Sequence, residues 1–118
     1  MKNKLRQSLS DVLAFEDDQA RSKSGRIALE IPNNNEVRLF LTLPEPKDPS
    51  IFLLMGVLTA FVATTAPELP DPETLIKTSC AELGKGRIAS IIKNFEGGRL
   101  EIAYDPEHFV FSFDVRRQ

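Results

Sequence analysis

The sequence predicts an α+β fold, in which an antiparallel sheet of about five strands packs against helices. Residues 51–66 form an apolar stretch without a charge, and a helix that is apolar on every side has to be buried. Segments before and after this stretch alternate apolar and polar residues, which is the period of half-buried strands, and turn-forming residues separate them. A chain of 118 residues is expected to fold as one domain, residues 1–118.

The N-terminal part predicts a helix followed by a β-hairpin. Apolar side chains recur at the i, i+4, i+7 and i+8 spacing of an amphipathic helix over residues 3–16. The residues on its apolar face are Leu5, Leu9, Val12 and Leu13. Strands are predicted over residues 26–31 and 36–43, because both segments alternate and the proline and asparagines of residues 32–35 favour a turn.

The uncharged stretch predicts a buried helix over residues 49–66, with Asp48 as its cap and Pro49 in its first turn. Its β-branched residues leave a buried strand followed by a short helix as the alternative. As a helix it would span about 24 Å, less than the roughly 30 Å of a bilayer core, so no membrane span is expected. Gly56 and Ala60 would lie on one helix face, where small residues allow close packing within the chain or self-association.

A further helix is predicted over residues 72–83, with Asp71 as its cap. Cys80 lies on the apolar face of this helix, where a lone cysteine usually acts as a small hydrophobic residue. The C-terminal part predicts two strands over residues 99–104 and 109–115. Three aromatic residues on one face of the last strand are expected to press on the central helix: Phe109, Phe111 and Phe113.

Residues 86–96 fit two different structures. They are rich in isoleucine and precede a glycine pair typical of a hairpin turn, so we favour a strand over residues 86–95. Their apolar residues also recur at i, i+3, i+4 and i+7, which fits a helix. The choice between these two interpretations decides the predicted architecture.

The sequence contains no grouping of residues that indicates catalysis. His108 is the only histidine, and Asp105 and Glu107 lie beside it in one predicted turn. A metal site needs ligands that converge from more than one element, so we interpret these residues as a solvent-exposed turn. We therefore expect a protein that is not an enzyme and that has no metal site and no cofactor.

A DNA-binding regulator is the first alternative. Residues 85–99 carry four basic residues and one acidic residue, and a helical 86–96 would give the element order of a winged helix-turn-helix. Four polar side chains would then face the major groove: Arg87, Ser90, Lys93 and Asn94. A net charge of −2 and an acidic predicted wing argue against this function, so nucleic acid is not the expected partner.

If residues 86–95 form a strand, the order becomes helix, two strands, helical middle and three strands. This order is similar to that of small dimeric adaptor domains of the roadblock/longin-like type and, more distantly, to that of the acidic chaperones of secretion systems. The similarity lies in the order of elements and covers no sequence motif, so it assigns no family.

The resulting hypothesis is a non-enzymatic protein–protein interaction or regulatory module, adaptor-like or chaperone-like, that forms a homodimer. Its candidate contact residues are Gly56, Ala60, Phe109, Phe111 and Phe113. If the sheet pairs edge to edge across a dimer, residues 26–31 or 109–115 are expected to supply the edge. A small-ligand sensor, with a pocket between the phenylalanine-rich strand and the central helix, is the second alternative. A single cysteine and the lack of an apolar N-terminal run indicate a cytoplasmic location.

Overall fold

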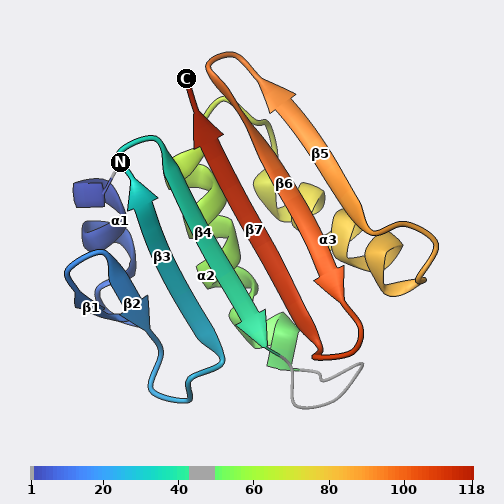
Figure 1. Ribbon diagram of the computed structural model, residues 1–118, viewed down its shortest axis with the longest axis horizontal. Helices are drawn as coiled ribbons and strands as arrows, with labels where there is room; N and C mark the ends of the chain where they lie inside the picture. Colours follow the sequence, from blue (N-terminus) through green and yellow to red (C-terminus); the bar gives the residue numbers. More distant parts are fainter. Residues whose placement is uncertain (1, 43–49) are drawn as a thin grey trace.

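The computed structural model describes residues 2–42 and 50–118, with the side chains of residues 3–42 and 55–118 (Figure 1). Within these ranges the chain forms one antiparallel sheet of seven strands and three helices. The elements in chain order are α1 (Lys2–Leu9), β1 (Ala14–Glu16), β2 (Gln19–Arg21), β3 (Ile27–Asn33), β4 (Glu36–Thr42), α2 (Ser50–Thr65), α3 (Pro72–Gly84), β5 (Ser90–Phe95), β6 (Gly98–Asp105) and β7 (Val110–Arg117). The predicted α+β class is therefore confirmed, whereas the predicted number of strands is wrong.

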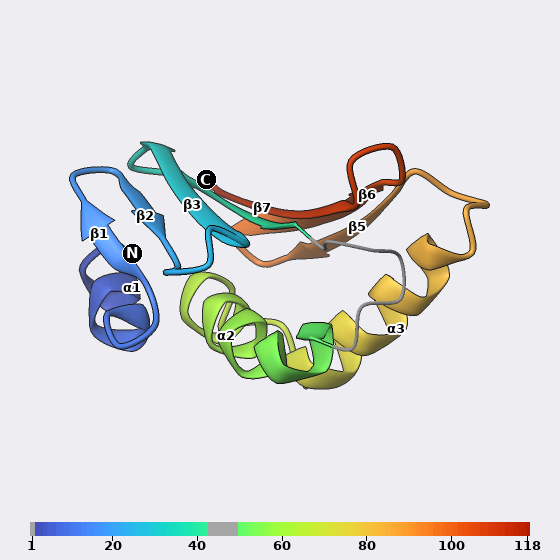
Figure 2. The same ribbon diagram turned by 90° about the horizontal axis from the view of Figure 1, so that it is seen from below.

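The sheet consists of two meanders, β1 to β4 and β5 to β7, and its strand order is β1-β2-β3-β4-β7-β6-β5. The two meanders join where β4 pairs with β7, from Glu36 opposite Arg116 to Thr42 opposite Val110. The helices α1, α2 and α3 lie on one face of the sheet, and no described helix covers the other face (Figure 2). We call that second face the helix-free face.

The hydrophobic core lies between the sheet and α2. Three side chains of α2, Leu58, Phe61 and Val62, are fully buried in one cluster with sheet residues that include Phe113. This is the position expected for a helix that is apolar on every side. The predicted helix 49–66 is confirmed within one residue at each end, and the alternative of a strand in this stretch is wrong. The predicted cap at residues 48–49 lies outside the described residues.

The C-terminal end of α2 is held by Arg117 of β7. Its guanidinium donates a hydrogen bond of 2.9 Å to the Thr65 carbonyl oxygen, bonds the Glu68 carboxylate, and lies 5.3 Å from the centre of the Phe95 ring. A cation at a helix C-terminus also interacts favourably with the helix dipole. One side chain therefore joins α2 to β7 and β5. As predicted, Asp71 caps α3 and accepts a hydrogen bond from the Thr74 amide.

The predicted helix 3–16 is wrong beyond Leu9, where α1 ends. Leu5, Leu9 and Leu13 are buried as the helical spacing indicated, but Val12 is 46% exposed. Ser10 and Asp11 follow α1, and such residues favour turns because their side chains compete for backbone hydrogen bonds. The chain then forms the short β1–β2 hairpin, which turns at Asp17 with a positive φ of 53°.

Residues 86–96 contain no helix, so the winged-helix alternative is wrong in its central element. The strand β5 begins at Ser90, four residues later than the predicted start of 86–95, because Gly86 turns the chain with a φ of 74°. Gly97, with a φ of 94°, makes the turn into β6.

The edge strands of the sheet are β1 and β5. The expectation that residues 26–31 or 109–115 supply an edge is therefore wrong. The β1–β2 hairpin extends the sheet beyond β3, and β7 lies between β4 and β6. Among the described helices, none combines the length and the apolar character needed to cross a membrane.

The close approach of β6 to β7 generates a first prediction. A Cβ atom at Gly98 would lie 2.3 Å from the Arg116 carbonyl oxygen and 3.0 Å from the Phe95 ring. Gly98→Ala is therefore expected to destabilise the fold by about 1–3 kcal/mol, measured by urea unfolding. Gly56→Ala is the control, because a Cβ there meets nothing within 4 Å. It should instead stabilise α2 by up to about 1 kcal/mol. Equal unfolding midpoints for Gly98→Ala and the native chain would contradict the close approach.

Candidate functional site

The candidate contact residues from the sequence occupy different environments. Phe111 and Phe113 are buried in the core, so their side chains are not available to a partner in the folded chain. Phe109 is half-buried in the turn directly before β7, with a positive φ of 56°. Gly56 is exposed on α2, and Ala60, one turn later, is half-buried. Of these five candidate residues, Gly56 is therefore the one that is exposed.

The four residues expected to face DNA do not share a face. Ser90 and Asn94 pair with Ala103 and Arg99 and point to the helix-free face. Lys93 pairs with the buried Leu100 and points to the opposite face. Arg87 lies before β5, in the connection from α3.

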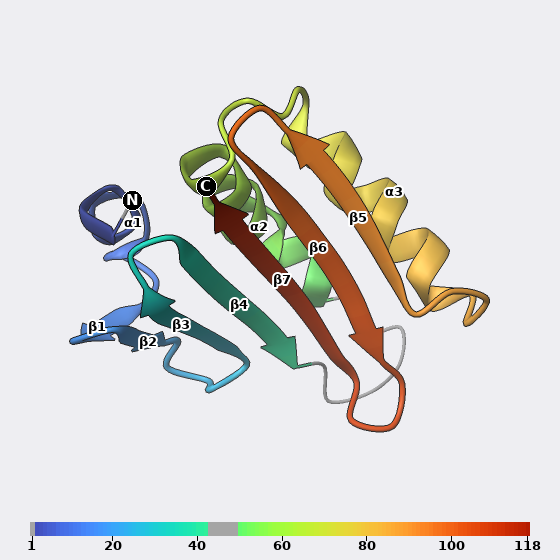
Figure 3. The same cartoon turned by 45° about the horizontal axis from the view of Figure 1, so that its top comes forward.

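The strand β5 lies at one of the two edges of the sheet. This six-residue strand pairs with β6 only, so its other edge has no strand neighbour among the described residues (Figure 3). Ile88 and Ile92 lie before and within this strand, and each is 47% exposed. Unpaired backbone beside exposed apolar side chains is a template for pairing with another chain.

A cleft adjoins the start of β5. Its volume is about 410 Å³, and it lies between the end of α3, the connection to β5 and the end of β6. The residues that line it are Leu83, Gly84, Gly86, Arg87, Ile88, Ala89, Tyr104 and Pro106. Arg87 on the rim and Lys93 within β5 are exposed and form no ion pair with any described residue. We call this cleft and the free edge of β5 the β5 site.

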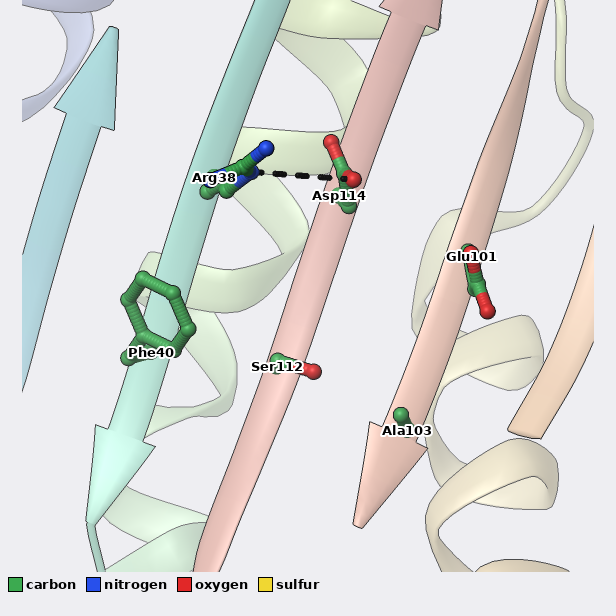
Figure 4. A pocket seen from close by; sticks show the side chains of 6 residues that line it. All are labelled: Arg38, Phe40, Glu101, Ala103, Ser112 and Asp114. Carbon is green, nitrogen blue, oxygen red and sulfur yellow. Dashed lines mark ion pairs between the residues drawn. The ribbon is translucent and has the colours of Figure 1, made fainter. Parts of the chain in front are cut away.

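A second, smaller hollow of about 290 Å³ lies on the helix-free face (Figure 4). Three charged residues, Arg38, Asp114 and Glu101, occupy one row across β4, β7 and β6. The next row presents Phe40, Ser112 and Ala103 to the same side, as Figure 4 shows.

The charges beside this hollow are largely paired within the sheet. One oxygen of Glu36, Oε2, accepts hydrogen bonds of 3.1 Å from Nε of Arg38 and from Nε of Arg116. Asp114 lies 3.4 Å from Nε of Arg116 and 3.8 Å from Nε of Arg38, while its Oδ1 is buried without a hydrogen-bond partner. These contacts stabilise the β4–β7 pairing and leave Glu101 as the one charged group of the hollow without a described ion pair.

Burial and the neighbouring Glu36 carboxylate raise the pKa of Asp114. Burial also acts to raise the pKa of Glu36, but hydrogen bonds from Asp114 and Arg38 and the charges of the two arginines outweigh it and lower that pKa. The two carboxylates therefore differ in how readily they ionise, as expected when like charges share a site. The difference is explained by the charge network and does not by itself indicate catalysis.

The turn between β6 and β7 brings together Asp105, Glu107 and His108, whose ligand atoms lie within 4.8 Å of one another. All three are exposed, and Asp105 accepts a hydrogen bond from the Glu107 amide and lies 2.7 Å from Nδ1 of His108. The bond to His108 is the main reason that the pKa of Asp105 is lowered. Elsewhere, burial raises the pKa of the Cys80 thiol to about 12, which keeps it protonated and unreactive.

No protein-family model matches the chain, and no significant match was found among curated proteins or solved structures. The β5 site therefore stands on its geometry alone. The sequence did not lead us to predict Ile88, Ile92 or Tyr104 as residues of the β5 site. A signal was present, because consecutive isoleucines in a strand point to opposite faces and one of them is left outside the core.

The charge network generates a second prediction, for Asp114→Asn, which keeps the shape of the side chain and removes its charge. Because the pKa of Asp114 is raised, the native chain loses stability as the pH rises through that pKa, and the variant does not. The melting temperature of the variant minus that of the native chain should therefore increase from about pH 4 to about pH 8.

Differential scanning calorimetry across this range measures the difference, and Asp11→Asn, at an exposed position outside the network, is the control. A difference for Asp114→Asn that stays constant or falls with rising pH would contradict the assignment.

Proposed function

We propose that this protein is a non-enzymatic protein–protein interaction module that binds an extended segment of a partner along the free edge of β5. The observation that carries this proposal is a six-residue edge strand whose outer edge has no strand neighbour in the described part of the chain, with Ile88 and Ile92 exposed beside it. Addition of a strand to such an edge supplies main-chain hydrogen bonds for affinity and side-chain pockets for specificity. The adjoining cleft offers one pocket.

The opposite edge of the sheet is less suited to this role. β1 spans three residues, Ala14–Glu16, and is followed at once by the turn at Asp17. A short edge strand offers few unpaired groups and is one of the ways in which proteins prevent unwanted pairing. The contrast between the two edges supports β5 as the binding edge.

The two alternative functions receive less support. The basic residues Arg87 and Lys93 do not lie on a helix that would enter a DNA groove. For a ligand sensor, the expected pocket lies between α2 and the phenylalanine-rich strand, where Phe61 and Phe113 are fully buried in one cluster. Both remain hypotheses that the β5 site does not favour.

A tethered strand tests the proposed function directly. The Gln118 amide donates a hydrogen bond of 2.8 Å to the Gly97 oxygen, so the C-terminus lies near the end of β5 where an antiparallel added strand would begin. A flexible linker of about ten Gly/Ser residues reaches about 16–19 Å on average. It can therefore span the roughly 14 Å of three strand spacings from β7 to the new strand.

The full chain is extended by this linker and by a neutral tail of about eight alternating valine and glutamine residues. If the tail adds to the sheet as a strand, hydrogen exchange of the β5 amides that point away from β6 is expected to be slower by about two-fold or more. Two-dimensional NMR of the labelled protein measures these rates. A tail with proline at every second position is the matched control, because it cannot donate the ladder hydrogen bonds. Equal rates with the neutral and proline tails would overturn the proposed edge.

We also propose that the chain forms a homodimer through the outward face of α2. A helix that is apolar on every side is typically covered on every side, yet Gly56 and Ala63 of α2 are exposed. This part of α2 carries no charge, so two copies can meet across a two-fold axis without like-charge repulsion. The small side chains also allow two helix axes to approach within about 8 Å.

Charge introduced on this face is expected to dissociate the dimer. Gly56→Arg and Ala63→Arg should be monomeric at a concentration where the native chain is dimeric with a dissociation constant of about 1 µM or below, because a buried unpaired charge is costly. Asn34→Arg, in the exposed β3–β4 turn, is the matched control and should remain dimeric. Sedimentation equilibrium measures all four proteins. A monomeric native chain at about 100 µM would overturn the homodimer and leave the β5 edge untouched.

A further inference from the structure

The chemistry of the β5 partner is indicated by Lys93. This residue lies in the middle of the strand, is exposed, and has no ion-pair partner among the described residues. Side chains directly opposite each other in an antiparallel pair have Cβ atoms about 4.5–5.5 Å apart, and like charges at such positions are destabilising. A strand added to β5 therefore pairs most favourably when it presents a carboxylate opposite Lys93. Any uncharged residue at that position leaves the ammonium group without an opposite charge.

A second copy of β5 does not supply that carboxylate. Residues directly opposite each other in an antiparallel pair lie on the same face of the sheet. In a symmetric antiparallel pair of two β5 strands, the two-fold axis therefore passes beside one residue, which lies opposite the same residue of the second copy. An axis at Lys93 places two ammonium groups opposite each other. An axis at Ile92 places each Lys93 opposite the partner's Ile91, and an axis at Ile91 places it opposite the partner's Ala89. Each of these registers leaves Lys93 without an opposite charge, and a lysine of this kind is a common protection against self-pairing.

The cleft adds a second basic group at the far end of the same edge. An antiparallel added strand begins near Phe95, runs past Lys93, and ends near Ser90, where the cleft opens. Arg87 lines this cleft together with apolar side chains, among them Ile88 and Tyr104. The end of the added segment therefore meets a pocket for an apolar side chain beside a guanidinium that suits a carboxylate.

We infer that the partner of the β5 site is an acidic extended segment of another protein, in which carboxylate and apolar residues alternate. Its carboxylates face Lys93 on the helix side of the sheet and Arg87 at the cleft, and its apolar residues cover Ile92 on the helix-free face. This inference rests on the proposed function, because it names the kind of segment that adds to β5.

Three tails that differ only in charge test the inference. The full chain carries the same linker and the same valines, with glutamine, glutamate or lysine at the alternate positions. An exposed ion pair contributes about 0.2–1 kcal/mol, which corresponds to a factor of about 1.4–5. The glutamate tail is therefore expected to slow exchange of the outward β5 amides about 1.4–5-fold more than the glutamine tail for each ion pair formed. The lysine tail should protect them least. About 0.5 M salt should remove most of the difference, because it screens exposed charges.

Charge reversal of the site provides the second arm. Arg87→Glu combined with Lys93→Glu should invert the order of the glutamate and lysine tails, whereas Lys4→Glu combined with Lys23→Glu, at exposed positions remote from β5, should leave it unchanged. The substituted side chains are exposed, so the fold is expected to persist, and the NMR spectrum reports this directly.

The outcomes separate the inference from the function on which it rests. If the glutamine tail protects β5 as well as the glutamate tail, strand addition stands and the acidic partner is overturned. If no tail protects β5 more than the proline control, both are overturned. If the untailed chain protects its own β5 amides in a concentration-dependent manner, a second copy is the occupant and the acidic partner is overturned.

Discussion

The pairing of β4 with β7 is the constraint on which the rest of the structure depends. These strands are far apart in the chain, yet seven consecutive residue pairs join them, and Glu36 receives hydrogen bonds from Arg38 on its own strand and from Arg116 across the pair. Their pairing turns two local meanders into one sheet. Because of this pairing, β4 and β7 are interior strands, and the second meander ends in β5 as an edge strand of the sheet.

The two faces of the sheet differ because α2 and α3 form the connection between the meanders. This connection covers one face of the sheet (Figure 2). Phe61 and Phe113 are both buried in the core cluster. The other face has to be compatible with water, and it carries the row of Arg38, Asp114 and Glu101 (Figure 4). Such a division between an apolar and a polar face is typical of antiparallel sheets.

The two edges of the sheet differ in length and in the side chains beside them. β1 is short and ends in an acidic turn, whereas β5 has six residues, an adjoining cleft, and two exposed isoleucines, Ile92 within the strand and Ile88 just before it. Lys93 in the middle of β5 opposes pairing with like charge without preventing pairing altogether. If β5 binds a partner strand as proposed, this repulsion makes the edge selective, because exclusion of wrong partners is a common source of specificity in interfaces.

The sequence by itself determined the features that depend on neighbouring residues. The alternating period of β3, β4, β6 and β7, the apolar helix α2 and the cap at Asp71 were all predicted, because local spacing and local hydrogen bonds decide them. The tertiary structure decided where α1 ends, that 90–95 is a strand, and which strands are edges. Phe113 and Ile92 show the reason. Both are apolar strand residues, but only long-range pairing places one in the core and leaves the other exposed at the edge.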